Sequence, residues 1–261
     1  LFTMGCTQSS NATAAVANTT KQTPTASGPS AAPPARTCKR IDKTCAATFG
    51  GVSVRYAYLS QSGYYPDDPT KPNQDAYVAS QDFAGRDADA FFGVFDGHGE
   101  AGDKCAQFAR KKIPSLLSKA TIKARAAGSE AELSEDTIRE VLVKTHKEVD
   151  MKMHRNANID DSLSGTTAVS LYLHGRQKRI TISNVGDSRA VIGRTASTDG
   201  KETLKAFALS EDQTPYRLDE RVRLRKAGAR IRTVDQITGV KPIDKDEANR
   251  DEKCLREGDD G

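Results

Sequence analysis

One stretch constrains the fold more than any other: it runs from Phe91 to Glu100 and reads FFGVFDGHGE. Its apolar, aromatic first half is typical of a buried strand, and the strand ends in an acid, two glycines and a histidine. Asp96 supplies a hard oxygen ligand, and Gly97 lets the backbone approach closely enough for its carbonyl to join a metal cluster. His98 is the side chain most easily tuned to exchange a proton near neutral pH. This combination indicates metal-assisted hydrolysis.

The same stretch also fits a nucleotide-binding pattern, G-x-G-x-x-G, starting at position 97. Two features count against that interpretation. Asp96 and Glu100 would place negative charge beside a pyrophosphate, and no acid lies between Asp103 and Glu130, where the ribose-binding carboxylate should occur. A plain glycine-rich turn after a strand remains open from this stretch alone.

Length and composition narrow the class of protein. A chain of 261 residues can hold one large domain or two small ones. The net charge of +4 is spread along the chain, which does not favour nucleic-acid binding. Five cysteines without a C-x-x-C pair suit a reducing compartment, so we expect a cytoplasmic protein. No apolar run approaches the ~20 residues that span a bilayer.

The N-terminal region, residues 1–48, is expected to be a disordered tether. Its central part is rich in Ala, Ser, Thr and Pro and cannot bury enough surface to offset its ordering entropy. If translation starts at Met4, Gly5 fits a myristoylation pattern and Cys6 is a palmitoylation candidate; the pattern fails if translation starts upstream. Two lipids would hold the protein peripherally at the cytoplasmic face of a membrane.

Periodicity predicts alternating strands and helices after the tether. Helical spacing of apolar residues indicates a helix over 105–120, which Pro114 should kink or split, and a second helix from Ser134 to Val149. His146 and His154 fall on or near that second helix without an acidic partner at ligand spacing, and we interpret both as surface or packing residues. Alternation and tight turns predict further strands, the later ones as an antiparallel meander, and a short final helix: strands 52–59, 76–79, 166–173, 179–184, 189–194 and 206–209, and helix 219–226.

Cysteine-based phosphatase chemistry is not supported. Only four residues separate Cys105 from Arg110, where a phosphate-cradling loop would need five, and Cys105 lies on the apolar helical stripe. Asp75, which follows a polar loop, reads by itself as a loop-capping residue.

Four separate strings, in order and in register, then identify a family. The chain resembles the metal-dependent type 2C Ser/Thr protein phosphatases (the PPM family) over about residues 52–261. Further strings near positions 212–217, 228–230 and 257–261 are similar to a plant and algal branch in which the phosphatase is fused to cyclic-nucleotide-binding and protein-kinase domains. The four strings are Asn73–Asp75, Phe92–Gly99, Ser164–Ala168 and Val185–Ala190.

The resemblance implies an α+β fold, an α/β/β/α sandwich of two antiparallel sheets flanked by helices. Residues 49–261 would be the N-terminal portion of this domain, C-terminally incomplete. In the family, the residue matching Asp96 bridges two Mg²⁺ or Mn²⁺ ions, the carbonyl matching Gly97 binds one of them, and the residue matching Asp75 holds coordinated water. Asp187 matches a further, weaker metal position, and His98 matches the acid that protonates the departing Ser or Thr oxygen.

The chain departs from the family in three places. Gln74 stands where many members have Glu, and Thr70 stands where many have a phosphate-gripping Arg; Lys71 is the nearest cation and could act as a point charge. Two further aspartates expected later in the domain are not in the chain. We therefore expect the 261 residues alone to be inactive or nearly so.

The resulting functional hypothesis is hydrolysis of phosphoserine and phosphothreonine in proteins, by a metal-activated water at a dinuclear centre, in signalling. The partners are phosphoprotein substrates, with no nucleic acid, and we expect a monomer. The alternative is a catalytically inactive, phosphatase-like binding scaffold. Metal titration would separate the two.

Overall fold

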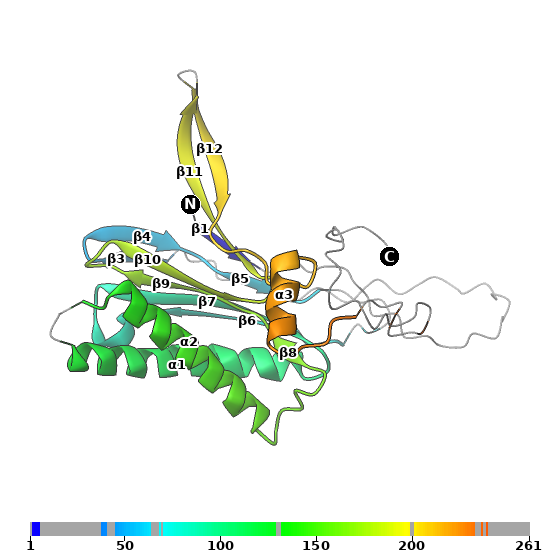
Figure 1. Ribbon diagram of the computed structural model, residues 1–261. Coiled ribbons are helices and arrows are strands. Elements are labelled where there is room, and N and C mark those ends of the chain that lie inside the picture. Colours follow the sequence, from blue (N-terminus) through cyan, green and yellow to red (C-terminus); the bar gives the residue numbers. More distant parts are fainter. Residues whose placement is uncertain are drawn as a thin grey trace.

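The computed structural model describes residues 2–5, 38–40, 45–63, 68, 70–128, 132–198, 201–232, 236 and 239 (Figure 1). Cys6, most of the expected tether and the motif at 257–261 lie outside these residues. Within the described part of the chain, no helix is both long enough and apolar enough to cross a membrane.

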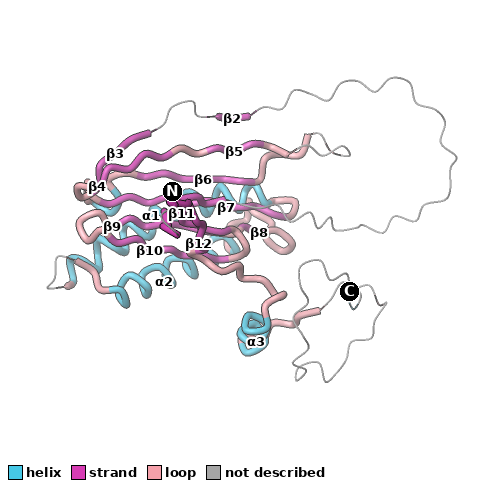
Figure 2. The backbone as a smooth tube through the Cα atoms, turned by 90° about the horizontal axis from the view of Figure 1, so that it is seen from above, coloured by secondary structure: helices cyan, strands magenta, loops and turns pink. Residues whose placement is uncertain are grey.

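An antiparallel sheet forms the centre of the molecule, with the strand order β10-β9-β7-β6. Strand β7 is ten residues long and mostly buried, as its aromatic sequence predicts. A two-residue strand, β8, pairs with its far end. Figure 2 shows the strands side by side from above. The bounds are β6 Asp75–Ser80, β7 Asp89–His98, β8 Gly165–Thr166, β9 Ala168–His174 and β10 Arg179–Val185.

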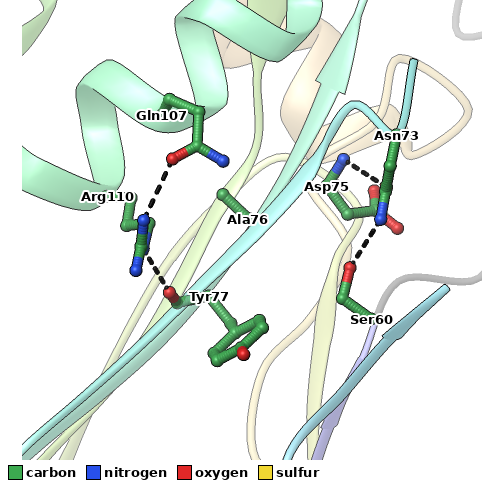
Figure 3. A pocket seen from close by; sticks show the side chains of 7 residues that line it. All are labelled: Ser60, Asn73, Asp75, Ala76, Tyr77, Gln107 and Arg110. Atoms are coloured by element: carbon green, nitrogen blue, oxygen red, sulfur yellow. Dashed lines mark hydrogen bonds between the residues drawn. The ribbon is translucent and has the colours of Figure 1, made fainter. Parts of the chain in front are cut away.

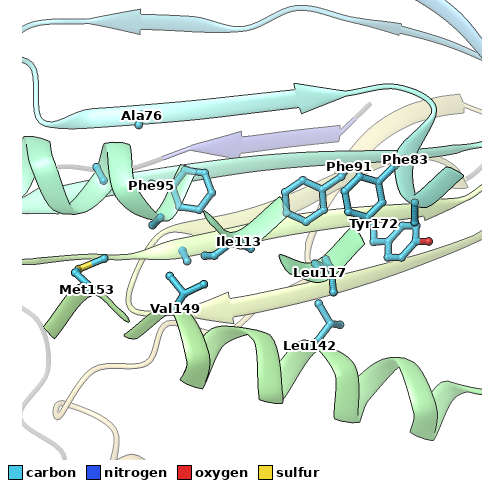
Figure 4. Packing of buried hydrophobic residues seen from close by; sticks show 14 of the residues in the cluster. Ala76, Phe83, Phe91, Phe95, Ile113, Leu117, Leu142, Val149, Met153 and Tyr172 are labelled. Carbon is cyan, nitrogen blue, oxygen red and sulfur yellow. The ribbon is translucent and has the colours of Figure 1, made fainter. Parts of the chain in front are cut away.

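Two helices, α1 (Gly102–Ala127) and α2 (Glu135–His154), cover one face of this sheet (Figure 1). The Ser134 hydroxyl accepts a hydrogen bond from the Thr137 N–H, so the predicted N-cap of α2 is confirmed. Phe91, Phe95, Leu117 and Tyr172 are almost completely buried between the helices and the sheet (Figure 4).

Pro114 was expected to kink or split the first helix, and the split is wrong. Helix α1 runs unbroken through Pro114 and is longer at both ends than predicted. Its neighbours Ile113 and Leu117 are both buried in the core. Packing of this face therefore outweighs the backbone hydrogen bond that proline removes.

Short strands pack on the other face of the sheet. A small cluster joins Phe49 to Ala90, Leu171 and Leu173. With α1 and α2, this makes a mixed fold of helices and antiparallel sheets, which confirms the predicted fold class; a helical layer outside the second strand layer is not seen among the described residues. The strands are β2 Cys38–Arg40, β3 Cys45–Phe49, β4 Val52–Tyr56 and β5 Leu59–Gln61, and a 3₁₀ turn, η1, spans Phe83–Gly85.

A long hairpin of β11 (Arg189–Thr198) and β12 (Lys201–Ala208) projects from the body, and α3 (Leu218–Lys226) lies at the end of the sheet (Figure 1). Strand β1 (Phe2–Gly5) pairs with β11. Strands β1, β2 and part of β3 fall within the range 1–48 expected to be a tether, and there the structure differs from that expectation. Strand pairing uses backbone N–H and C=O groups, so composition is a weak guide to whether a segment joins an exposed edge.

A buried polar network lies where β7 begins. Asp89, which is 1% exposed, accepts hydrogen bonds from Arg125 Nη2 (2.6 Å), the Tyr172 hydroxyl (3.0 Å) and the Gly175 N–H (3.3 Å). Burial, and then the Asp89 charge, raise the pKa of Tyr172. The ring of His174 stacks on Tyr172 at 3.9 Å, and burial, then Arg179, lower the pKa of His174 to about 4.

His146 and His154 fit the surface or packing roles expected of them. His146 Nδ1 lies 2.9 Å from the Leu142 carbonyl oxygen and Nε2 lies 3.3 Å from the Ser183 hydroxyl, so this side chain packs α2 on the sheet. His154 is exposed, but it lies 3.2 Å from an Asp161 carboxylate oxygen. The loop after α2 supplies this acidic neighbour, which the sequence spacing did not predict.

Candidate metal centre

The centre is built where β6 begins and β7 ends. The antiparallel register pairs Asp75 directly with Asp96, and both residues are half-buried. Burial first, and then the charge of Asp96 and a hydrogen bond to it, raise the pKa of Asp75 to about 6. Two carboxylates therefore share one small volume, although 21 positions separate them in the sequence.

The donors fit a hard divalent cation. Mg²⁺ and Mn²⁺ prefer carboxylate and carbonyl oxygens, and a cation between Asp75 and Asp96 would remove the repulsion that raises the Asp75 pKa. Gly97 follows directly, and only glycine fits there: a Cβ would lie 2.1 Å from the Gly102 carbonyl oxygen and 2.6 Å from that of Gln74. Within the described residues, however, no group of three or more His, Cys, Asp or Glu side chains is arranged to hold a metal.

Asp187 lies in the turn between β10 and β11, which two hydroxyl groups tie to the centre. The Thr167 hydroxyl accepts a hydrogen bond from the Asp96 N–H at 3.0 Å, and its oxygen lies 2.6 Å from the Ser188 hydroxyl. Both side chains are buried. The structure therefore links the backbone of Asp96 to the turn that carries Asp187, but it does not group the Asp187 carboxylate with the other two.

Thr167 and Ser188 were noticed in the sequence only as parts of motifs, and no role was assigned to them. Each is a small hydroxyl residue directly before a strand, and Ser188 also follows Asp187 in the sequence. That adjacency was the signal available for Ser188, and Thr167 had none. The contact between them joins residues 21 positions apart and becomes visible only in the folded chain.

His98 is the last residue of β7 and is exposed. It pairs with Gly165 of β8, and a Cβ added at Gly165 would lie 2.9 Å from His98 Nε2. The imidazole therefore lies against the bare backbone of this glycine. His98 is thus exposed to solvent two residues after Asp96 on the same strand.

Gln74 closes the loop that follows β7. Its Nε2 donates a hydrogen bond of 2.5 Å to the Gly99 carbonyl oxygen. A glutamate, which has no N–H, could not donate this bond at neutral pH. The departure from the family pattern at position 74 therefore has a structural role here.

Two cavities adjoin Asp75. A cavity of about 30 Å³ is lined by Lys71, Asp75 and Gly97, among others. Thr70 instead bonds within its loop, where its N–H and hydroxyl donate to Asp68. A larger cavity, of about 230 Å³, lies between β6 and α1 and includes Arg110 in its lining (Figure 3).

Comparison with known proteins places this geometry in a family. The family model described as Protein phosphatase 2C matches residues 68–241. The chain is 38% identical over 189 residues to "Probable protein phosphatase 2C 35" of Arabidopsis thaliana, covering 71% of this chain and 48% of that protein. It is 32% identical over 189 residues to "Probable protein phosphatase 2C 73" of Oryza sativa subsp. japonica, covering 64% and 44%. The chain thus spans about half the length of the curated relatives it matches.

Two solved structures are similar over part of the chain. "Structure of a C.elegans sex determining protein" is 21% identical, with a TM-score of 0.45, and covers 63% of this chain and 37% of that one. The PPM Ser-Thr phosphatase MsPP of Mycobacterium smegmatis, in complex with cacodylate, is 16% identical, with a TM-score of 0.29, and covers 59% and 58%.

Proposed function

The chain belongs to the protein phosphatase 2C family, and on that premise we propose that it serves the metal-dependent hydrolysis of phosphoserine and phosphothreonine in proteins, in signalling. The observation that carries the proposal is the pairing of Asp75 with Asp96, which holds two half-buried carboxylates together at the end of a rigid strand. Such a pair is unfavourable by itself and becomes favourable when it binds a cation.

Each residue of the centre has a role in this proposal. Asp75, Asp96 and the Gly97 carbonyl would hold two Mg²⁺ or Mn²⁺ ions, and Asp187 would contribute to a third, weaker position. When bound, these ions lower the pKa of water and offset charge on the phosphoryl oxygens. His98, exposed at the end of the same strand as Asp96, would protonate the departing Ser or Thr oxygen.

Lys71 is the proposed phosphate contact. It lines the small cavity together with Asp75 and Gly97. An ammonium group attracts a phosphate as a point charge, without the two-point grip of a guanidinium. We therefore propose weaker phosphate binding at this position than an arginine would give.

The alternative function is a phosphatase-like scaffold that binds proteins without catalysis. It is favoured by one observation: within the described residues, the carboxylate pair is not joined by a third metal-binding side chain. A scaffold needs no metal, whereas a phosphatase of this kind does. Metal binding therefore separates the two.

The test is calorimetric titration with Mn²⁺ at pH 7.5 of the chain, of Asp96→Asn and of Asp87→Asn. Asp87 is an exposed carboxylate just before the other end of β7 and serves as the matched control. We expect Asp96→Asn to weaken Mn²⁺ binding by about tenfold or more, because a charged ligand is lost, and Asp87→Asn to leave it unchanged. Equal affinity in all three proteins would refute the proposal and favour the scaffold.

Hydrolysis is then measured as phosphate release from a phosphothreonine peptide in Mn²⁺. We propose that the 261 residues by themselves release phosphate slowly, because the described residues offer only two carboxylates in contact. Any release should depend on Mn²⁺ and disappear in Asp96→Asn. Rapid turnover by this chain would show that its ligand set is already sufficient.

We also propose that the protein is cytoplasmic and associates with membranes through lipids on Gly5 and Cys6. Expression with Gly5→Ala should then move the protein from the membrane fraction to the soluble fraction. Ser10→Ala, in the same segment but outside the Met4–Ser9 pattern, tests whether any change there has this effect. Unchanged partition of Gly5→Ala would refute the anchor.

A further inference from the structure

The larger cavity beside the carboxylate pair contains a cation to which neither the family pattern nor the proposed mechanism gives a role. Arg110 and Gln107 of α1 line one side of it, and Asp75 lies across β6 with Asn73 and Ser60 (Figure 3). Its volume of about 230 Å³ is large enough for an acidic side chain. Of its lining residues, Arg110 alone is a cation.

The guanidinium is held in place by two hydrogen bonds. Strand β6 is the last strand of the central sheet among those described, and Arg110 Nε donates to the Tyr77 carbonyl oxygen at 2.7 Å. Nη1 donates to Gln107 Oε1 at 3.1 Å. Arginine has five N–H groups, so three remain without a hydrogen-bond acceptor among the described residues.

Arg110 differs from a surface arginine that only caps a backbone carbonyl at the edge of a sheet. The Nε bond to Tyr77 is enough to cap the carbonyl, and it fixes the plane of the guanidinium. The remaining donors belong to a side chain that is only half-exposed and lines a cavity. A pre-oriented fork of donors is the geometry that binds carboxylates and phosphates.

The cavity also adjoins the proposed active site. Asn73 and Asp75 line both this cavity and the smaller one that contains Lys71 and Gly97. A phosphorylated side chain in the smaller cavity would therefore place neighbouring residues of the same peptide at the larger one. Asp75 by itself would repel an acidic side chain here. A cation bound in the proposed centre would offset the negative charge of Asp75 and weaken this repulsion.

We propose that this cavity is a specificity subsite that receives an acidic side chain of the phosphoprotein substrate, and that Arg110 binds its carboxylate. The inference rests on the proposed function and deepens it, since it names the substrate class: phosphosites with a nearby Asp or Glu. Arg110 is then a specificity-determining residue from α1, at a position unrelated to the arginine that is missing at position 70.

The test uses binding, so it does not depend on turnover. The probes are fluorescent nine-residue peptides with a non-hydrolysable phosphonate in place of phosphothreonine, either with alanine at all other positions or with one Glu at each position in turn. Affinity is measured by anisotropy in Mn²⁺ for the chain, Arg110→Gln and Lys111→Gln. Lys111 is the next residue of α1, is exposed and does not line the cavity, so it controls for net charge.

We expect at least one Glu position to tighten binding about three- to tenfold in the chain and in Lys111→Gln. Arg110→Gln should lose that gain while its affinity for the all-alanine peptide stays the same. A purely structural role for Arg110 would weaken both peptides together and lower the melting temperature. Should Arg110→Gln not fold, Arg110→Lys retains the charge without the fork and should reduce the gain.

Two results would overturn the subsite: no Glu position that tightens binding, or a gain that survives in Arg110→Gln. A different result would overturn the proposed function: failure of the all-alanine phosphonate peptide to bind, or binding of that peptide that is unchanged in Asp96→Asn. The two failures are thus distinguishable. Tight binding of free inorganic phosphate that depends on Arg110, without any Glu effect, would also refute the peptide subsite.

Discussion

The two ends of strand β7 place a carboxylate in opposite environments. At its beginning, the nearly fully buried Asp89 accepts hydrogen bonds from Arg125, Tyr172 and the Gly175 N–H. At its end, Asp96 faces Asp75, and this contact contributes to raising the pKa of Asp75 to about 6. The same strand thus carries one satisfied acid and one acid placed against another acid.

The difference separates a structural carboxylate from a candidate functional one. A buried charge that is paired and hydrogen-bonded holds elements together, here β7, β9 and α1. Two carboxylates in contact destabilise the free protein and create affinity for a cation. A rigid strand joins the two ends, so the stabilising network at Asp89 offsets the repulsion between Asp75 and Asp96 at the other end.

The largest effect should come from breaking the satisfied end. Arg125→Met removes the cation from Asp89 and leaves a buried charge, so we expect the free energy of unfolding to fall by about 3–5 kcal/mol. Urea denaturation followed by circular dichroism measures this. The double variant Asp89→Asn/Arg125→Met should recover part of the loss. A loss below about 1 kcal/mol would show that the network is not structural.

The two ends should also give opposite pH dependence. His174 has a folded pKa of about 4, below its usual 6.5, so the unfolded state binds more protons between these values and this group's contribution to stability rises with pH. Between pH 6.5 and pH 4 this group lowers the free energy of unfolding by about 3 kcal/mol. Asp75 has a folded pKa of about 6, above 3.8, so its contribution falls as pH rises over that window.

Two variants separate the pH dependence that comes from His174 from the pH dependence that comes from Asp75. In EDTA, His174→Gln should remove the loss of stability below pH 6.5, and Asp75→Asn should make that loss steeper. Denaturation midpoints from pH 4 to 7 provide the measurement. If the denaturation midpoints of both variants changed with pH in the same way, the two ends would not have opposite pH dependence.

A smaller effect of opposite sign to that of Arg125→Met is expected from Asp75→Asn at pH 7.5. Removing one of two adjacent carboxylates should stabilise the metal-free protein by roughly 1 kcal/mol, after allowance for the screening of a half-exposed group. With saturating Mn²⁺ the order should reverse, because the wild-type chain gains binding energy that the variant lacks. Thermal melts in EDTA and in Mn²⁺ measure both. A variant that is destabilised in EDTA would refute the strained pair.

The smallest effect concerns the loop after β7. Gln74→Glu removes the N–H that donates to the Gly99 carbonyl oxygen, and we expect a loss of about 0.5 kcal/mol at pH 7.5, since this bond is exposed. Ser115→Glu, at an exposed position of α1 that lines neither cavity, is the control for adding a charge. An unchanged melting temperature in Gln74→Glu would mean that this bond does not hold the loop.

Much of the fold could be predicted from the sequence because its signals are local. The aromatic run ending at Asp96 indicates a buried strand, and the apolar stripe through Cys105 and Leu117 indicates α1. The continuity of α1 through Pro114 could not be predicted, because core packing decided it. The acidic neighbour of His154 was missed because a loop, without periodicity, brings Asp161 to it.

The candidate site can also be divided into what the sequence predicts and what it does not. The sequence alone determined which groups are present, Asp75, Asp96, Gly97 and His98, since residue type sets whether an atom can ligate a metal or carry a proton. Only the tertiary structure decided which groups meet. The β6–β7 register places Asp75 on Asp96 and leaves Asp187 outside that contact, and α1 brings Arg110 to the same edge. Register and helix packing are set by burial of side chains far from the site, so no local pattern encodes them.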